Sequence, residues 1–229
     1  MPSTGSTIDV VERTVDGEAS ARQQHWEAVY ARTNADEVSW FEPAPSFSLA
    51  MLDAVGADPT MAVVDVGAGA SRLAAALLQR GFADVTALDV AEDGLAVART
   101  ELGPNAERIT WVTADLLTWS PPRRFDIWHD RAVFHFLTGS AQQQRYVCVA
   151  QAALHPGGKL IVATFADDGP EQCSGLPAAR YSPARLVDTF NTHSGAAFEL
   201  LDHRREEHRT PSGAVQPFTW VALAHREAA

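Results

Sequence analysis

The sequence predicts an α/β protein with a doubly wound, mostly parallel seven-stranded sheet, helices on both faces and a C-terminal antiparallel hairpin. Three observations predict this fold. From Met61 onward, short apolar segments alternate with amphipathic helical segments, which is typical of strand–helix–strand units. A glycine-rich turn at Gly67 follows the first of these strands. Two last strand-like segments are separated by charged and turn residues, which favours an antiparallel pair.

The composition suits one globular domain: 229 residues are 46% hydrophobic and 21% charged. No apolar run approaches the roughly 20 residues of a membrane span, and no signal-peptide pattern is visible, so we expect a cytoplasmic protein without membrane contact. The formal net charge of −11 disfavours nonspecific nucleic-acid binding, which depends on Lys and Arg facing phosphates. Cys148 and Cys173 are too few for a closed metal site, and no histidine pair has a metal-binding helical spacing, so we expect no metal. Nothing in the sequence indicates an oligomeric state.

The N-terminal part divides into two regions that precede the core. Residues 1–20 are polar and lack periodicity, so we expect a flexible tail. Residues 21–58 are expected to form cap helices, because apolar side chains recur at helical spacing within Ala21–Tyr30 and Ser46–Val55. Residues 59–229 are then the core, and residues 21–229 together form one domain.

Within the core, strands are predicted where short apolar runs end in glycine or polar residues, and helices where the apolar period is 3.6. The strands are expected at Met61–Val66, Asp84–Val90, Arg108–Ala114, Phe125–His129, Lys159–Phe165, Ala197–His203 and Phe218–Ala224. Leu73, Leu77 and Leu78 mark the first core helix, and a second helix is expected at Glu92–Leu102.

The later helices have clearer signals. Tyr146, Val149, Ala150 and Ala153 share one face, which predicts a helix over Ser140–Leu154. Further along, Ser182 is a typical N-cap, and the proline that follows it suits the first helical position, so a helix is expected to begin there and reach about Phe190.

The segment from Val63 to Ser71 is the most informative for function. Glycines at the end of a first strand let the backbone turn sharply and approach a ligand closely. Asp89 lies about 20 positions further on, at the end of the next strand, where a carboxylate can accept hydrogen bonds from ribose hydroxyls. This combination predicts a ligand that contains a nucleoside.

Asp65 decides which nucleoside is expected. In a dinucleotide-binding turn a third glycine lets the helix pack near a pyrophosphate, but here that position is Ser71 and a carboxylate precedes the turn. Asp65 would repel a pyrophosphate and would suit a cationic amino-acid group. The electrostatics therefore favour S-adenosylmethionine over a nicotinamide dinucleotide.

At this point the sequence resembles the class I methyltransferase family, seven-strand Rossmann-like enzymes that use S-adenosylmethionine. The resemblance extends from about Trp26 to Trp220. Five segments carry it, in the order of the family's motifs: Asp65–Gly69, Leu88–Val90, Ala114–Leu116, Phe125–Trp128 and Leu154–Gly158.

The resemblance implies the roles of several side chains. Asp65 would lie near the methionine amino group, Gly67 and Gly69 would line the methionine, and Asp89 would hold the ribose. Asp115, which is alternatively a plain helix cap, would contact adenine. The full set of expected cofactor residues is Trp40, Asp65, Gly67, Ala68, Gly69, Ser71, Asp89, Val90, Asp115 and Leu116.

The methyl acceptor is expected beyond the fourth and fifth strands, because ligands of open α/β sheets bind at the carboxyl ends of the strands. His129 and His135 are candidate bases, since imidazole titrates near neutral pH, and Asp130 lies between them. The alternative is that these residues only pack and form ion pairs. The candidate catalytic residues are His129, Asp130 and His135, and the candidate substrate residues are Phe41, Arg131, Phe134, Arg180 and Tyr181.

Three functions stay open at this stage. The favoured one is methyl transfer to a nitrogen, oxygen or sulfur atom of a small molecule. The second is methylation of a protein lysine, because His129–Arg131 is partly similar to the Asp-Lys-Gly segment of seven-strand lysine methyltransferases. The third is a module that binds the cofactor, whose product form is S-adenosylhomocysteine, without turnover.

Overall fold

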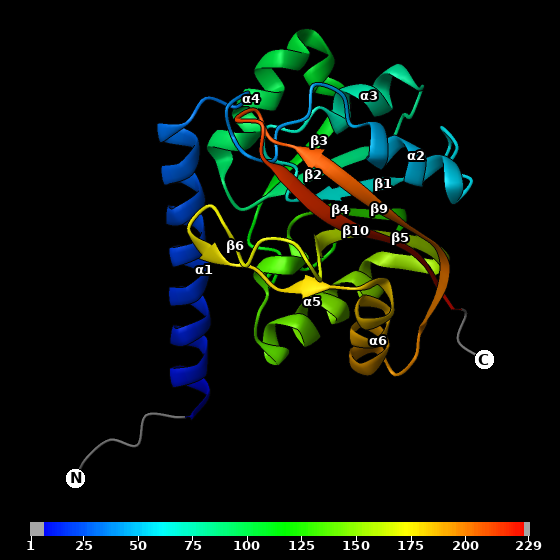
Figure 1. The fold of residues 1–229 in the computed structure, drawn as a ribbon. Helices are drawn as coiled ribbons and strands as arrows, with labels where there is room; N and C mark the ends of the chain where they lie inside the picture. The colour runs from blue at the N-terminus through cyan, green and yellow to red at the C-terminus, as the bar shows by residue number, and fades with distance from the viewer. Residues whose placement is uncertain (1–6, 227–229) are drawn as a thin grey trace.

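The computed structural model describes residues 7–226, with side chains from Gly17 onward. A central sheet has the strand order β3-β2-β1-β4-β5-β10-β9, and a short strand β8 pairs with the end of β5 (Figure 1). The first five strands of this order run parallel, and β10 pairs antiparallel with both of its neighbours. The predicted mostly parallel sheet with a C-terminal antiparallel pair is therefore confirmed. The strands of the main sheet are β1 (Val63–Val66), β2 (Val85–Asp89), β3 (Ile109–Thr113), β4 (Phe125–Arg131), β5 (Leu154–Ala166), β8 (Arg180–Tyr181), β9 (Phe198–Arg209) and β10 (Val215–His225).

The helices cover both faces of this sheet, and α1 stands along one edge of the molecule in Figure 1. Each face has its own buried apolar cluster: α2 and α3 pack on one side, while α5 and α6 pack on the other. No helix in the described part of the chain is long and apolar enough to span a membrane. The helices are α1 (Thr7–Arg32), α2 (Ser46–Ala54), α3 (Leu73–Gln79), α4 (Glu92–Leu102), α5 (Ser140–Ala153) and α6 (Pro183–Ser194), with short 3-10 turns at η1 (Gly103–Arg108) and η2 (Phe134–Phe136).

The N-terminal helix is longer than the sequence pattern indicated. Residues 7–20, expected to belong to a tail, form the first half of α1. The whole helix is free of proline, but its residues are polar on average, so the composition of its first half resembles that of a tail. Residues 1–6 of the expected tail lie outside the described residues.

Several strands also extend beyond their expected limits. β5 begins at Leu154 rather than Lys159, because the expected turn at residues 155–158 continues the strand. β9 and β10 reach Arg209 and Val215, since charged residues between the predicted strands still pair across the hairpin. The segment after β5 contains a small separate hairpin, β6 (Gln172–Cys173) with β7 (Leu176–Pro177).

The expected start of α6 is confirmed in detail. The Ser182 side chain accepts a hydrogen bond from the backbone nitrogen of Arg185, and Pro183 occupies the first turn. The helix ends at Ser194, and Gly195 after it has a left-handed backbone at φ 67°.

A buried polar network joins β4 to α5. The Tyr146 hydroxyl donates to the Asp130 carboxylate at 2.5 Å and accepts from the Trp128 indole at 2.9 Å. All three side chains are fully buried. Asp130 also accepts hydrogen bonds from the backbone nitrogens of Val133 and Phe134, so this carboxylate fixes the chain where it leaves β4.

We predict that Tyr146→Phe lowers the free energy of unfolding by about 1–3 kcal/mol, because a buried carboxylate loses a donor and a buried indole loses its acceptor. The midpoint of urea denaturation measures this loss. Tyr181→Phe is the matched control: its hydroxyl only accepts from Gln143, at 3.0 Å in a part-buried position. Equal stability of the two variants would contradict the structural role of the network.

Candidate active site

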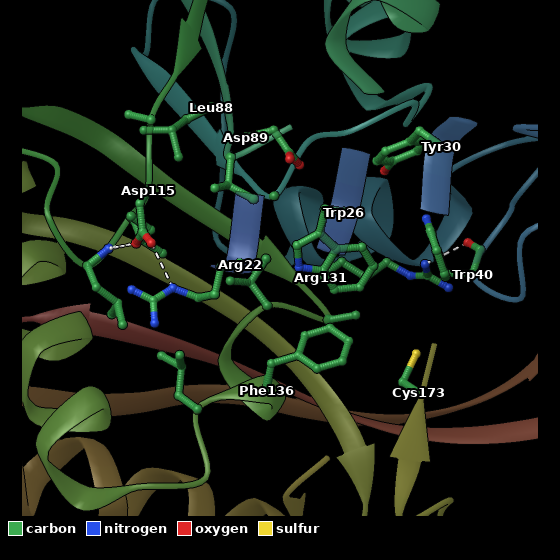
Figure 2. Close-up of a pocket in the computed structure, with 18 of the residues that line it drawn as sticks. Arg22, Trp26, Tyr30, Trp40, Leu88, Asp89, Asp115, Arg131, Phe136 and Cys173 are labelled. Carbon is green, nitrogen blue, oxygen red and sulfur yellow. Dashed lines mark hydrogen bonds and ion pairs between the residues drawn. The ribbon is translucent and has the colours of Figure 1, made fainter. Parts of the chain in front are cut away.

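A cavity of about 120 Å³ lies at the carboxyl ends of the parallel strands and is lined by Gly67, Asp89 and Arg131. Figure 2 shows Asp89 and Arg131 among the side chains around it. The facing wall comes from α1, whose Arg22, Trp26 and Tyr30 lie four residues apart and therefore on one helix face. A smaller neighbouring cavity shares Trp40, Gly67 and Arg131 with the first. We refer to these two adjoining cavities together as the cleft.

Most of the expected cofactor residues line this cleft. Those in the larger cavity are Trp40, Gly67, Asp89, Val90, Asp115 and Leu116. Those in the smaller cavity are Trp40, Asp65, Gly67, Ala68 and Ser71. Gly69 lines neither cavity, but its backbone nitrogen donates to Asp89, which lines the larger one.

The glycines of the turn are required by their surroundings. Gly67 has φ 67°, and a Cβ added there would lie 2.0 Å from Val133 Cγ2. Gly69 has φ 45°, and an added Cβ would lie 2.0 Å from the Tyr30 hydroxyl. Both positions have a left-handed backbone and a close neighbour, so the backbone conformation and the lack of space each exclude a side chain.

Asp89 is held rigidly at the end of β2. Its Oδ2 accepts from the backbone nitrogen of Gly69 at 2.9 Å, and its Oδ1 accepts from that of Ala91 at 2.8 Å. Burial raises the pKa of this carboxyl to about 6, and nearby Asp65 adds to the rise while the backbone hydrogen bonds oppose it. The result is a fixed carboxylate at the cavity wall with lone pairs left for a ligand.

Asp115 serves two structural purposes. Its Oδ1 accepts from the backbone nitrogen of Leu117 at 2.8 Å, which caps the turn after β3, and its Oδ2 accepts from Arg22 Nε at 2.7 Å. The ion pair attaches α1 to the core beside the cavity (Figure 2). Arg22, Trp26 and Tyr30 were not predicted as site residues. Their spacing in a helix was the available signal.

Asp65, His129 and Ser48 form a buried chain of hydrogen bonds. His129 Nδ1 lies 2.7 Å from Asp65 Oδ1, and His129 Nε2 lies 3.0 Å from Ser48 Oγ. All three side chains are almost completely buried. With both ring nitrogens engaged, His129 orients Asp65, and a role as a base toward a substrate, which the sequence suggested, finds no support in this geometry.

The other two candidate catalytic residues lie away from the cleft wall. His135 is fully buried, its Nδ1 faces the Phe165 backbone nitrogen at 3.4 Å, and burial lowers its pKa to about 3. A ring with so low a pKa is a poor base near neutral pH. Asp130 is engaged by Tyr146 inside the core. We therefore correct both expectations: these residues support β4 and its following turn, and they do not face a substrate.

Some of the candidate substrate residues line the cavities, and others do not. Arg131 lines both cavities, and Phe41 lines the smaller one. Phe134 is fully buried in the aromatic core, and its place in the cavity is taken by Phe136. The orientation of side chains in the turn η2 determines which phenylalanine lines the cavity, and the sequence alone did not reveal which one it is.

Arg180 and Tyr181, also expected at the substrate site, lie elsewhere. Arg180 pairs with Glu171 at 2.9 Å on the surface, and Tyr181 is buried with its hydroxyl accepting from Gln143. Both belong to β8, whose pairing with the end of β5 fixes them. The segment after β5 instead contributes Cys173 to the cavity.

A charged cluster lies behind Arg131. The ligand atoms of Glu42, Glu206 and His208 all lie within 4.8 Å of one another, a spacing that can hold a metal ion. Here Arg131 lies among the carboxylates, with Nε 3.3 Å from Glu42 and Nη2 3.9 Å from Glu206. The guanidinium therefore already supplies a positive charge to this cluster.

Comparisons with known proteins bear on the fold and the family. Residues 63–158 match the family described as a methyltransferase domain. A search of curated proteins finds no match. Among solved structures, one from work on the conversion of a disulfide bond into a thioacetal group during echinomycin biosynthesis is 22% identical, covers 90% of this chain and 94% of its own, and has a TM-score of 0.69.

Two further structures have similar scores. A 1,6-didemethyltoxoflavin-N1-methyltransferase from Burkholderia thailandensis is 19% identical, with coverage of 99% and 94% and a TM-score of 0.65. The N-methyltransferase NodS from Bradyrhizobium japonicum is 16% identical, with coverage of 88% and 98% and a TM-score of 0.65. At these identities the likeness shows the fold. The matched segment runs from β1 to the start of β5 and includes the glycine turn and Asp89, so this part of the chain is similar to a methyltransferase domain.

Proposed function

We propose that this protein transfers a methyl group from S-adenosylmethionine to a small-molecule nucleophile. The observation that carries the proposal is the cleft itself. It has buried carboxylates at Asp65 and Asp89, a third at Asp115, and an aromatic wall from α1. S-adenosylmethionine is the cofactor of the class I methyltransferases that this chain resembles. Its adenosine and amino-acid parts are the groups that such carboxylates recognise.

The residues present fit this cofactor. Asp89 faces the position expected for ribose hydroxyls, and the apolar side chains of Leu88 and Leu116 line the adjoining wall. Asp65 lines the smaller cavity, where an ammonium group would meet a carboxylate already oriented by His129. The glycine turn brings the backbone close enough to line the space between them.

The chain contributes alignment and exclusion of water. Asp65 and Asp89 would hold S-adenosylmethionine at its amino-acid and ribose parts, and the bound cofactor would supply an electrophilic methyl group for a lone pair of the acceptor. Trp26, Trp40 and Phe136 would hold the acceptor in a dry position, and such positioning supplies much of the rate.

Similar structures support the choice of a small acceptor. The Burkholderia enzyme was crystallised with 1,6-didemethyltoxoflavin and S-adenosylhomocysteine, and another similar structure is a glycopeptide N-methyltransferase bound to sinefungin. In our chain α1 covers the cleft with Arg22, Trp26 and Tyr30, which leaves a narrow space suited to a compact molecule. Release of S-adenosylhomocysteine with a panel of small thiols, amines and phenols, compared with candidate proteins, tests the proposal.

We predict that Asp89→Ala weakens the binding of S-adenosylhomocysteine by roughly 10- to 150-fold, because charge-assisted hydrogen bonds of about 1.5–3 kcal/mol to the ribose are lost. Isothermal calorimetry measures the affinity. Asp93→Asn, an exposed change in the first turn of α4, is the control and should bind normally. Unchanged affinity in Asp89→Ala would remove the ribose assignment.

The pH dependence of binding follows from the same carboxyl group. Its pKa of about 6 means that the carboxylate form is lost as the pH falls below 6. We therefore expect the affinity for S-adenosylhomocysteine to be constant above about pH 7 and to decline on acidification through pH 6. Asp89→Asn should bind weakly at every pH and show little of this decline; an identical profile in both proteins would contradict the assignment.

The role of His129 is tested with two ligands. His129→Phe removes the donor that orients Asp65, so S-adenosylhomocysteine should bind about tenfold more weakly. 5′-Methylthioadenosine lacks the amino-acid part and should bind the variant within about twofold of the original protein. Ser48→Ala should have the same effect in a smaller degree. An equal loss for both ligands would indicate general damage to the cleft instead.

A further inference from the structure

The part of the cleft away from Asp115 is aromatic. The Trp26 ring lies edge to face with Trp40 at 5.8 Å and with Phe136 at 5.0 Å between centroids. Phe165 and Phe218 meet at 5.0 Å and line the same cavity. Figure 2 shows Trp40 and Cys173 on the opposite side from Asp115. Rings in such arrangements favour a flat aromatic guest.

Arg131 is the cation nearest to these rings, and its charge is already cancelled. The guanidinium lies over the Phe218 ring at 5.0 Å and donates from Nη1 to the Trp40 carbonyl at 3.0 Å. Glu42 and Glu206 lie 3.3 and 3.9 Å from its other nitrogens, and the side chain is only 11% exposed. Two carboxylates therefore share one buried cation.

The carboxyl groups of Glu42 and Glu206 determine the net charge of the cluster around Arg131. Burial raises the pKa of Glu42 to about 7, with Arg131 opposing the rise and Glu206 adding to it. Two carboxyl groups face one guanidinium here, so the charges of Glu42, Glu206 and Arg131 sum to zero or less whenever either carboxyl group is ionised.

The other arginines of the cleft are paired as well. Arg22 pairs with Asp115 at 2.7 Å, and Arg72 pairs with Glu101 at 3.3 Å. Among the described residues that line the two cavities, each arginine thus has a carboxylate partner. An anionic acceptor would meet no unpaired arginine side chain among these residues and would approach several carboxylates. A protonated amine has no lone pair, so it would have to lose its proton before it could accept a methyl group.

We infer, on the basis of the function proposed above, that the acceptor is an uncharged, flat aromatic molecule. In this inference Glu42 and Glu206 determine specificity: they cancel the charge of Arg131 and thereby exclude acceptors that carry a carboxylate. Like-charge contacts in a desolvated site cost enough to reject one ligand in favour of its neutral analogue.

Two fluorescent probes test this selectivity. 2-Naphthol and 6-hydroxy-2-naphthoate share the ring system and the hydroxyl group and differ by one carboxylate. Each is titrated into the full-length protein saturated with S-adenosylhomocysteine, and binding is read from probe fluorescence. We expect 2-naphthol to bind at least about tenfold more tightly. Equal affinity, preference for the naphthoate, or no binding of 2-naphthol at millimolar concentration would overturn the inference.

Substitutions locate the origin of the selectivity. The double change Glu42→Gln with Glu206→Gln leaves Arg131 unbalanced while keeping the oxygen that accepts from the Trp220 indole at 2.8 Å. The ratio of naphthoate to naphthol affinity should rise at least about tenfold in this variant. Glu171→Gln removes the partner of the surface residue Arg180 and should leave the ratio unchanged. An unchanged ratio in the double variant would overturn the assigned role.

Two controls separate the possible failures. Thermal melting and S-adenosylhomocysteine affinity are measured for every variant, and Glu42→Gln alone replaces the double change if the latter does not fold. A smaller rise in the ratio is then expected, because one carboxylate is removed instead of two; no rise would again contradict the inference. Failure of the unmodified protein to bind S-adenosylhomocysteine would instead contradict the proposed function itself.

Discussion

Three carboxylates lie buried at the carboxyl ends of adjacent strands, and the site depends on the hydrogen bonds that make their burial possible. Asp65 on β1 is met by His129, Asp89 on β2 by two backbone nitrogens, and Asp130 on β4 by Tyr146 and the turn that follows. An ionised group without such donors would be too costly to bury. Each partner therefore fixes both a charge and the local course of the chain.

The same hydrogen bonds stabilise both the strand ends of the sheet and the wall of the cleft. The glycine turn after β1 supplies a donor to Asp89, while Asp130 organises the turn that carries Val133 against Gly67. The cleft wall is thus built from the same contacts that close the strand ends. The aromatic side chains from α1 and the Trp40 loop then cover a wall that is already rigid.

Local signals in the sequence were sufficient for the sheet and for the wall of the cleft that contains the glycine turn and Asp89. Each of these signals can be recognised from neighbouring residues in the sequence: the short apolar runs, the glycines at 67 and 69, and the acid at 89. The opposite wall depends on contacts between distant segments, such as Arg131 with Glu206 or Arg22 with Asp115. The sequence also could not show that Phe136 lines the cavity while Phe134 and His135 face the core, because the orientation of side chains in η2 determines this.

The face of α1 that covers the cleft makes three contacts with the core, all from one helix. Arg22 is paired with Asp115, Trp26 packs on Phe136, and Tyr30 lies over Gly69. A helix moves as a unit, so these contacts would be released together. Exchange of spent cofactor for fresh would then depend on a single concerted displacement, and its frequency would set an upper limit on the turnover rate.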